Sequence, residues 1–271
     1  MYIRNYKNDK GNDRFIVFED AHEMVEHAPR VERQFRKGSS WVGGDFATFK
    51  QCVTVGDESL VAESERFLSE IEDQVPVSIG WRNVDDVVGA IPNVPAFLAG
   101  HPQCMRRRER TAKETAPLFI YMDLTSSASV SARSVQRRGI VLLALVRMLV
   151  EHRSVELYVG TSIGEYRISE TCMWHIDTRP LDLARAAYHI SSTAMARGFG
   201  YGMVHDEFCT DNGHWPFADH GYHIRTAKSR LANIFPGVEI LYIPPIYGTD
   251  EMIERPVQWL KEQMSQYVKE E

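Results

Sequence analysis

The sequence contains no long apolar run. Its longest uncharged apolar block covers residues 139–146 and lies between Arg138 and Arg147. A helix that crosses a membrane needs about 20 predominantly apolar residues, so we expect this block to form a buried helix and expect no membrane contact. Residues 1–7 also lack the apolar core of a secretory signal. Together these absences predict a cytoplasmic protein.

Closely spaced cysteines and an excess of positive charge are absent as well. The four cysteines are far apart and form no Cys-x-x-Cys pair, so we expect thiols in a reducing compartment. Acidic residues outnumber Lys and Arg by 37 to 31, and the net charge of −6 gives no overall attraction for nucleic acid or an anionic membrane. With 271 residues and 44% hydrophobic content, the chain is long enough for one large domain.

Three common catalytic or nucleotide-binding patterns are also missing. The chain has no Gly-x-Ser-x-Gly elbow, no Gly-x4-Gly-Lys loop and no Gly-x-Gly-x-x-Gly sequence. The usual sequence support for a serine hydrolase or a nucleotide-binding loop is therefore lacking. We favour a protein that is not an enzyme.

What the chain does contain is a β-α-β unit. An apolar run over residues 118–123 ends in Asp123, a helix of about 25 residues begins near Ala128, and a second apolar run covers residues 155–160. This order is typical of a parallel sheet. We predict an α/β fold with a mostly parallel, doubly wound sheet and helices on both faces, in a domain of residues 117–271.

The remaining elements follow from periodicity and from capping residues. The run 165–174 is expected to form a hairpin with 155–160, and 238–243 to form the last strand. Ser129 or Ser131 is expected to cap the long helix, and Asp177 or Thr178 the next one. Helices are predicted over residues 19–27, 57–71, 181–197, 224–235 and 249–269. Residues 75–117 are rich in Pro and Gly without periodicity, which predicts a join after a helical and irregular N-terminal extension of residues 1–116.

The polar residues that follow the first strand of this unit form the main candidate site. Asp123, Thr125 and Ser127 alternate after the strand end, where side chains can point into one crevice. Carboxylate and hydroxyl oxygens are hard donors, which suit Mg²⁺ or Mn²⁺. The same hydroxyls could instead cap the following helix.

The sequence Asp123-x-Thr125-x-Ser127 resembles the Asp-x-Ser-x-Ser metal-ion-dependent adhesion site of von Willebrand factor A-like domains, with Thr125 in place of a Ser. The resemblance covers about residues 117–271. It implies a non-enzymatic protein-binding module that holds Mg²⁺ or Mn²⁺ and takes up a carboxylate of its partner. Thr178 would be the separate threonine ligand and Asp206 the last ligand. Domains of this family often work beside AAA-type ATPases, so the resemblance also implies such a partner.

The whole chain resembles uncharacterised proteins from tailed-phage genomes. The residues that carry this resemblance are Trp41-Val42-Gly43-Gly44, residues 94–102 and Arg138-Gly139. The resemblance implies a phage origin, and with it a location in the host cytoplasm.

Two further clusters provide alternative functions. The first is rich in zinc ligands and would give a metal-dependent hydrolase with Asp206 or Glu207 as the general base. Its residues are His205, Cys209, His214, His220 and His223. The second is the basic run from Arg106 to Arg110, which is either a solvated charged surface or a contact surface for the phosphates of nucleic acid.

Overall fold

The computed structural model describes most of the chain. The described residues are 1–8, 11–36, 39–71, 74–75, 81–89, 91–110, 117–127, 129–165, 168–208 and 230–268.

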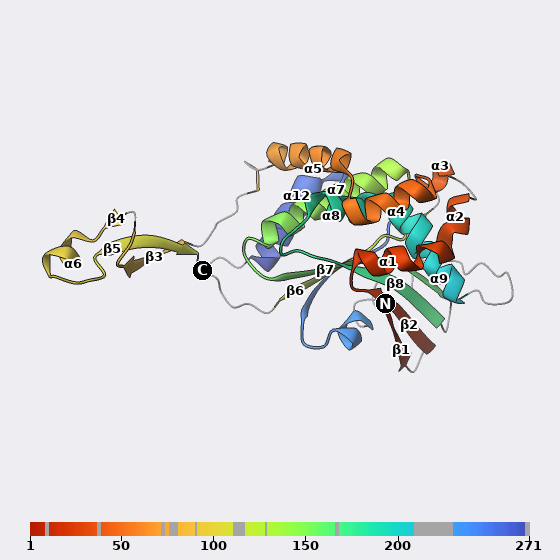
Figure 1. Ribbon diagram of the computed structural model, residues 1–271, viewed down its shortest axis with the longest axis horizontal. Helices are drawn as coiled ribbons and strands as arrows, with labels where there is room; N and C mark the ends of the chain where they lie inside the picture. The colour runs from red at the N-terminus through yellow and green to blue at the C-terminus, as the bar shows by residue number, and fades with distance from the viewer. Residues whose placement is uncertain are drawn as a thin grey trace.

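The centre of the molecule is a six-stranded sheet with the order β1-β2-β8-β7-β6-β9 (Figure 1). Strand β6 lies between β7 and β9 and runs parallel to both, while β8 is antiparallel to β7 and parallel to β2. A mixed α/β fold with a mostly parallel sheet is therefore confirmed, and so is the hairpin of β7 and β8. The strands are β1 (Tyr2–Asn8), β2 (Gly11–Phe18), β6 (Leu118–Asp123), β7 (Val155–Glu165), β8 (Ile168–Ile176) and β9 (Glu239–Ile243).

The first two strands correct the expectation that residues 1–116 form a helical and irregular extension. Strand β1 is antiparallel to β2, and β2 pairs with β8 from Asn12 to Phe18. Ile16 and Phe18 are fully buried in the same core as Leu118. No break in the core therefore coincides with the predicted boundary between residues 116 and 117.

Helices cover one face of this sheet, as the labelled helices in Figure 1 show. Helix α7 packs against α5, α8 and α12 as well as the sheet, which explains why residues 139–146 are apolar all round. The helices on this side are α1 (Ala21–His27), η1 (Ala28–Val31), α2 (Glu32–Arg36), α3 (Ser39–Val42), α4 (Phe46–Val55), α5 (Glu58–Ile71), α7 (Ala132–Leu149), α8 (Leu183–Ser191), η2 (Ala194–Gly200), α9 (Tyr201–Phe208), α11 (Glu251–Glu254) and α12 (Pro256–Tyr267). No helix in the described part of the chain is long and apolar enough to cross a membrane.

The opposite face carries a second, smaller core. Phe119 and Tyr121 of β6 pack there with Met173 of β8, and Leu231 and Ile234 of a short helix, residues 230–234, cover them. This short helix confirms part of the helix predicted over residues 224–235. Residues 209–229 lie outside the described residues, so helices on both faces in a doubly wound arrangement stay a prediction.

Helix ends depend on local hydrogen bonds that the sequence predicted in part. Ser131 caps α7 by accepting from Ser134 N at 3.0 Å, as one of the two expected caps. Helix α8 is capped by Asp182, so the expected caps Asp177 and Thr178 were wrong. The helix predicted over residues 249–269 is divided at Arg255, because Pro256 begins a new helix as its first residue.

Residues 81–110 form a separate three-stranded sheet, which we call the small sheet. It has the order β3-β5-β4, and a short helix follows β4. The run from Arg106 to Arg110 is thus part of a strand, within a region that had been predicted to be irregular. The elements are β3 (Trp81–Asp86), β4 (Ile91–Pro92), α6 (Val94–Leu98) and β5 (Met105–Arg110).

Candidate functional site

Asp123 is the last residue of β6, and its side chain is only 2% exposed. Its Oδ1 atom accepts a hydrogen bond from Thr125 N at 2.9 Å, a local bond between side chain and backbone at the end of the strand. Burial raises the pKa of the Asp123 carboxyl, while hydrogen bonds from Thr125 and Ser162 and the charge of Arg138 lower it. The strand end therefore holds a carboxyl group whose buried position disfavours its charge.

The hydroxyl of Thr125 continues the sheet beyond the end of β6. It donates to the carbonyl oxygen of Ser162 at 3.1 Å and accepts from Ser162 N at 2.9 Å. These are the two hydrogen bonds to β7 that the backbone of a neighbouring strand would otherwise make. On the other side, Ile246 N donates to Thr125 O and Ser127 N donates to Ile246 O, both at 3.0 Å. The Ser127 hydroxyl lies 2.9 Å from that of Ser129. In the predicted metal motif, the Thr125 hydroxyl is thus bonded to β7 and the Ser127 hydroxyl to the loop itself.

Arg138 lies beneath this loop and is the largest buried charge there, with 2% exposure. It donates to the carbonyl oxygens of Asp123, at 3.2 Å, and of Pro244, and so joins the ends of β6 and β9. Its Nε lies 2.7 Å from Oδ2 of Asp250, the residue that caps α11. Burial lowers the pKa of Arg138, but the charges of Asp250 and Asp123 oppose this effect.

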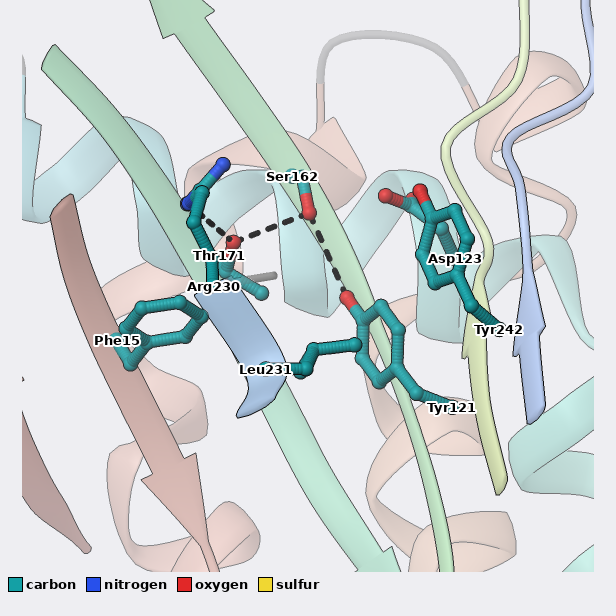
Figure 2. A pocket seen from close by; sticks show the side chains of 8 residues that line it. All are labelled: Phe15, Tyr121, Asp123, Ser162, Thr171, Arg230, Leu231 and Tyr242. Carbon is teal, nitrogen blue, oxygen red and sulfur yellow. Dashed lines mark hydrogen bonds between the residues drawn. The ribbon is translucent and has the colours of Figure 1, made fainter. Parts of the chain in front are cut away.

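A small pocket opens beside Asp123 on the less covered face of the sheet (Figure 2). Five of the six strands contribute to it. The free room inside it is about 10 Å³, close to the space that one water molecule needs. It therefore suits a water or a very small polar group. The lining residues are Phe15, Tyr121, Asp123, Ser162, Thr171, Arg230, Leu231 and Tyr242.

Hydroxyl groups form a chain of hydrogen bonds across this pocket. Ser162 Oγ lies 3.4 Å from the Tyr121 hydroxyl and 3.1 Å from Thr171 Oγ1. Arg230 donates to Thr171 Oγ1 at 3.5 Å, and Figure 2 shows the whole chain as dashed lines. Burial raises the pKa of Tyr121 well above its ordinary value, with a further rise from the charge of Asp123, so this phenol stays protonated.

Tyr242 completes the pocket at the end where Asp123 lies (Figure 2). Its ring is nearly parallel to that of Tyr121, at an interplanar angle of 10° and a centroid distance of 6.0 Å. The hydroxyl of Tyr242 is buried and has no hydrogen-bond partner in the described structure. Burial, and next the charge of Asp123, raise the pKa of this hydroxyl. A buried hydroxyl without a partner costs free energy unless a water or a ligand group bonds to it.

The structure brings Asp123, Thr125 and Ser127 into one loop but places the other two predicted ligands elsewhere. Thr178 donates to the carbonyl oxygen of Val155 at 2.7 Å, at the start of β7, whereas Asp123 pairs with Gly160 further along that strand. Thr178 therefore lies at the opposite end of the sheet, because β8 runs antiparallel to β7 and delivers its last residues there.

Asp206 is held by a different part of the molecule. Its carboxylate accepts from Arg30 Nε at 2.8 Å and lies 3.6 Å from Arg33 Nη2. The described residues hold no group of three or more His, Cys, Asp or Glu placed to bind a metal ion. The five-residue ligand set for Mg²⁺ or Mn²⁺ does not fit this geometry. Any ion at Asp123 would need other ligands, in competition with the buried guanidinium of Arg138.

The structure tests the basic run in part and leaves the predicted zinc site untested. The backbone of His205 lies in α9, and Cys209, His214, His220 and His223 lie outside the described residues, so the zinc hypothesis stays a prediction. In the basic run, Arg106 and Arg107 form ion pairs with Asp85 and Asp86 of β3. This neutralises two of the charges that were proposed to contact nucleic acid.

Sequence reasoning found Asp123 but missed most of the pocket. Phe119, Tyr121 and Asp123 alternate along one strand, and this period of two was a usable signal that Tyr121 shares a face with Asp123. Ser162, Thr171 and Tyr242 come from three other strands, and only the strand order brings them together.

Comparisons with known proteins add a family without a known role. A family model described as "Domain of unknown function (DUF7192)" matches residues 5–265. No curated protein and no solved structure matches the chain.

Proposed function

The chain belongs to the DUF7192 family, a domain of unknown function, and we propose that it is a non-enzymatic binding module whose binding edge lies at the carboxyl ends of β6 and β9. One observation carries this proposal. The buried carboxyl of Asp123 and the buried, unpartnered hydroxyl of Tyr242 line the same small pocket. A partner group that donates to Asp123 and bonds with Tyr242 would remove the cost of that unpartnered hydroxyl.

The strand order supports this position. After β6 the chain passes through α7 to β7 on one side, and β9 later adds on the other side of β6. Open α/β sheets bind their ligands at the carboxyl ends of their parallel strands. Asp123 and Tyr242 belong to these two neighbouring parallel strands.

The raised tyrosine pKa values favour binding over catalysis. Tyr121 and Tyr242 remain neutral phenols in the physiological range, since burial disfavours their ionised forms. Neutral phenols donate and accept hydrogen bonds, but they are poor bases and nucleophiles. The proposed partner is a protein that presents a small polar group, and an AAA-type ATPase remains the partner implied by the resemblance to von Willebrand factor A-like domains.

The test compares proteins retained from native cell extract by immobilised wild type and by three variants. We expect Asp123→Asn and Tyr242→Phe each to retain the specific partner at least about tenfold less, because the first replaces an accepting oxygen by a donating NH₂ group and the second removes a hydroxyl. Asp177→Asn is the matched control, since Asp177 is an exposed carboxylate beside Thr178 at the opposite end of the sheet. Quantitative mass spectrometry supplies the readout.

The same samples, washed with Mg²⁺, Mn²⁺ or a chelator, test the role of an ion. Retention that depends on the ion in wild type, and that is lost in Asp123→Asn, would support a divalent-ion site with ligands other than Thr178 and Asp206. Identical sets of retained proteins on wild type and Asp123→Asn would remove the proposed binding edge, with or without an ion.

A further inference from the structure

Arg197 is a buried positive charge that no carboxylate of the described residues balances. Its side chain is 6% exposed, and burial lowers its pKa with no opposing effect from a nearby acid. Two other buried arginines are paired with acids: Arg138 with Asp250 at 2.7 Å and Arg153 with Glu239 at 2.8 Å. Because a buried charge without an opposite charge costs free energy, an anion that bound beside Arg197 would stabilise the fold.

Carbonyl oxygens and one hydroxyl hold the guanidinium of Arg197. Its Nη1 donates to the carbonyl oxygen of Trp41 at 3.1 Å, and its Nη2 donates to that of Val130 at 2.7 Å. Nη2 also donates to Ser126 Oγ at 3.4 Å, which is long for a hydrogen bond, and the buried Nε has no hydrogen-bond partner in the described structure. The guanidinium therefore meets only partial negative charges, and its bond to Ser126 is the longest of the three.

These contacts join Arg197 to the loop between β6 and α7, next to the amino-terminal end of α7. Val130 directly precedes Ser131, the N-cap of this 18-residue helix. The first N–H groups of a helix have no partner within it and carry a partial positive charge. The first turn of α7 contains no acidic residue, although acids normally balance such an end, and Arg133 in that turn and Arg137 in the next are exposed.

The carboxylates that contact the start of α7 are bonded to other side chains. Glu63 accepts from Gln136 Nε2 at 2.6 Å, and Asp250 is paired with Arg138. Among the described residues, neither acid forms an ion pair with Arg197 or with the two exposed arginines of the helix. The described part of this helix end therefore has a surplus of positive charge, which favours a bound anion.

The Trp41-Val42-Gly43-Gly44 sequence places an aromatic ring over the guanidinium. The ring of Trp41 lies 5.2 Å from Arg197 Cζ, and Trp41 is 39% exposed. Gly43 has a φ of +88°, which favours glycine, and a Cβ there would overlap Thr193, directly before η2. Helix η2, which carries Arg197, is a π-helix, a rare class that is often found at functional sites. The ring lowers the local dielectric, so the attraction of Arg197 for an anion is stronger than in water.

We propose that Arg197, Ser126 and the first N–H groups of α7 bind a phosphate group. A guanidinium, a hydroxyl and the N–H groups of a helix end are all donors that suit phosphate oxygens. One oxygen takes the place of Ser126 Oγ as the acceptor from Arg197 Nη2, which leaves the hydroxyl free to donate to a second oxygen. The site shares no residue with the pocket beside Asp123 and does not depend on the proposed function.

Isothermal titration of the full chain with inorganic phosphate, at pH 8 and constant ionic strength, tests the proposal. Arg197→Met keeps the length of the side chain and removes its charge, so it should weaken phosphate binding at least about tenfold. Arg133→Gln changes an exposed position and should weaken binding about threefold, because it removes a charge from the helix end. Arg147→Gln removes an equally exposed arginine at the other end of α7 and is the control, which should bind phosphate like wild type.

Thermal unfolding separates the loss of a ligand contact from the loss of folding. Phosphate should raise the Tm of wild type and leave that of Arg197→Met unchanged, since a ligand stabilises only a protein that binds it. If Arg197→Met does not fold, Ser126→Ala provides the comparison and should weaken phosphate binding about threefold, because it removes one donor.

Phosphoserine distinguishes a phosphate group carried by a larger ligand from the free ion. Tighter binding of phosphoserine than of phosphate supports the first source, and tighter binding of phosphate supports the second. A wild type that binds neither, or an affinity for phosphate that is unchanged in Arg197→Met and Ser126→Ala, would overturn the proposal. Acetate that binds as tightly as phosphate would overturn the assignment of a phosphate group.

Discussion

Glu170 shows what burial does to a single charged residue in this sheet. Its side chain on β8 is 1% exposed, and neither carboxylate oxygen accepts a hydrogen bond in the described structure. Arg14 Nη1 lies 3.7 Å from Oε1. Burial raises the pKa of Glu170 to about 7, although the positive charge of Arg14 opposes the rise. The folded state therefore binds the proton of this carboxyl more tightly than the unfolded state does.

The raised pKa predicts how stability depends on pH. Because ionised Glu170 is disfavoured only in the folded protein, its contribution to stability is lost as pH rises from about 4.5 through about 7. Glu170→Gln cannot ionise, so it should be more stable than wild type at pH 8, by on the order of 3 kcal/mol, and within about 1 kcal/mol of it at pH 5. Urea unfolding at both pH values measures this. Glu65→Gln, at an exposed position of α5, is the control, and an equal effect of both substitutions would contradict the prediction.

Arg138 shows which part of the site around Asp123 could not be predicted from the sequence of the metal motif. The alternation of Asp123, Thr125 and Ser127 predicted one loop with shared orientation, and the three residues do lie in one loop. The sequence could not indicate that a guanidinium from α7 would bond to the carbonyl oxygens at this strand end. That contact depends on where α7 packs along the sheet, because this position decides whether Arg138 lies next to the ends of β6 and β9.

At the scale of elements, α7 and α8 approach each other through a glycine. A Cβ atom on Gly139 would lie 2.4 Å from Ser191 Oγ and 2.8 Å from the carbonyl oxygen of Ile190. Contacts this short cannot be accommodated without moving one helix, so the absence of a side chain sets the distance between the two helices.

Gly139→Ala should therefore destabilise the protein in spite of the higher helix propensity of Ala. We expect the overpacking to lower the free energy of unfolding by about 1–3 kcal/mol, which exceeds the roughly 1 kcal/mol that Ala gains over Gly within a helix. Thermal and urea unfolding provide the measurement. Gly44→Ala is the control, because its Cβ would have no neighbour within 4 Å. A Gly139→Ala variant as stable as wild type would show that the helices adjust freely.

Strands β1 and β2 show why an element can be missed. Phe15, Ile16, Val17 and Phe18 are all buried, because Phe15 and Val17 face one core and Ile16 and Phe18 the other. Such a run has no period of two and is too short to be distinguished from other apolar runs. Residues before it are mostly polar, so the sequence favoured an extension where the structure has two strands.

At the scale of the whole molecule, the small sheet lies outside the buried cores of the central sheet. None of its described residues belongs to the buried apolar clusters, whereas Ile16 and Phe18 of β2 do. The chain therefore has an inserted unit at residues 81–110, in place of the N-terminal extension that composition predicted.

Replacing residues 76–116 with about 15 Gly and Ser residues tests this organisation. We expect the shortened chain to keep a cooperative urea transition with nearly the midpoint of wild type, because none of the described residues between 76 and 116 belongs to a buried apolar cluster. Removal of residues 1–18 is the matched comparison and should abolish the cooperative transition, since it takes two strands from the central sheet. Circular dichroism follows both. Loss of cooperativity in the first chain would mean that the small sheet stabilises the central sheet.

By itself the sequence determined the local elements whose signals are contained in a few neighbouring residues. These include the buried strand ending in Asp123, the apolar helix α7 with its Ser131 cap, and the hairpin of β7 and β8. Only the tertiary structure decided which strand ends meet. The antiparallel direction of β8 carries Thr178 away from Asp123, and the position of β9 beside β6 brings Tyr242 to it. Strand direction and order depend on contacts between residues far apart in the chain, which local periodicity does not encode.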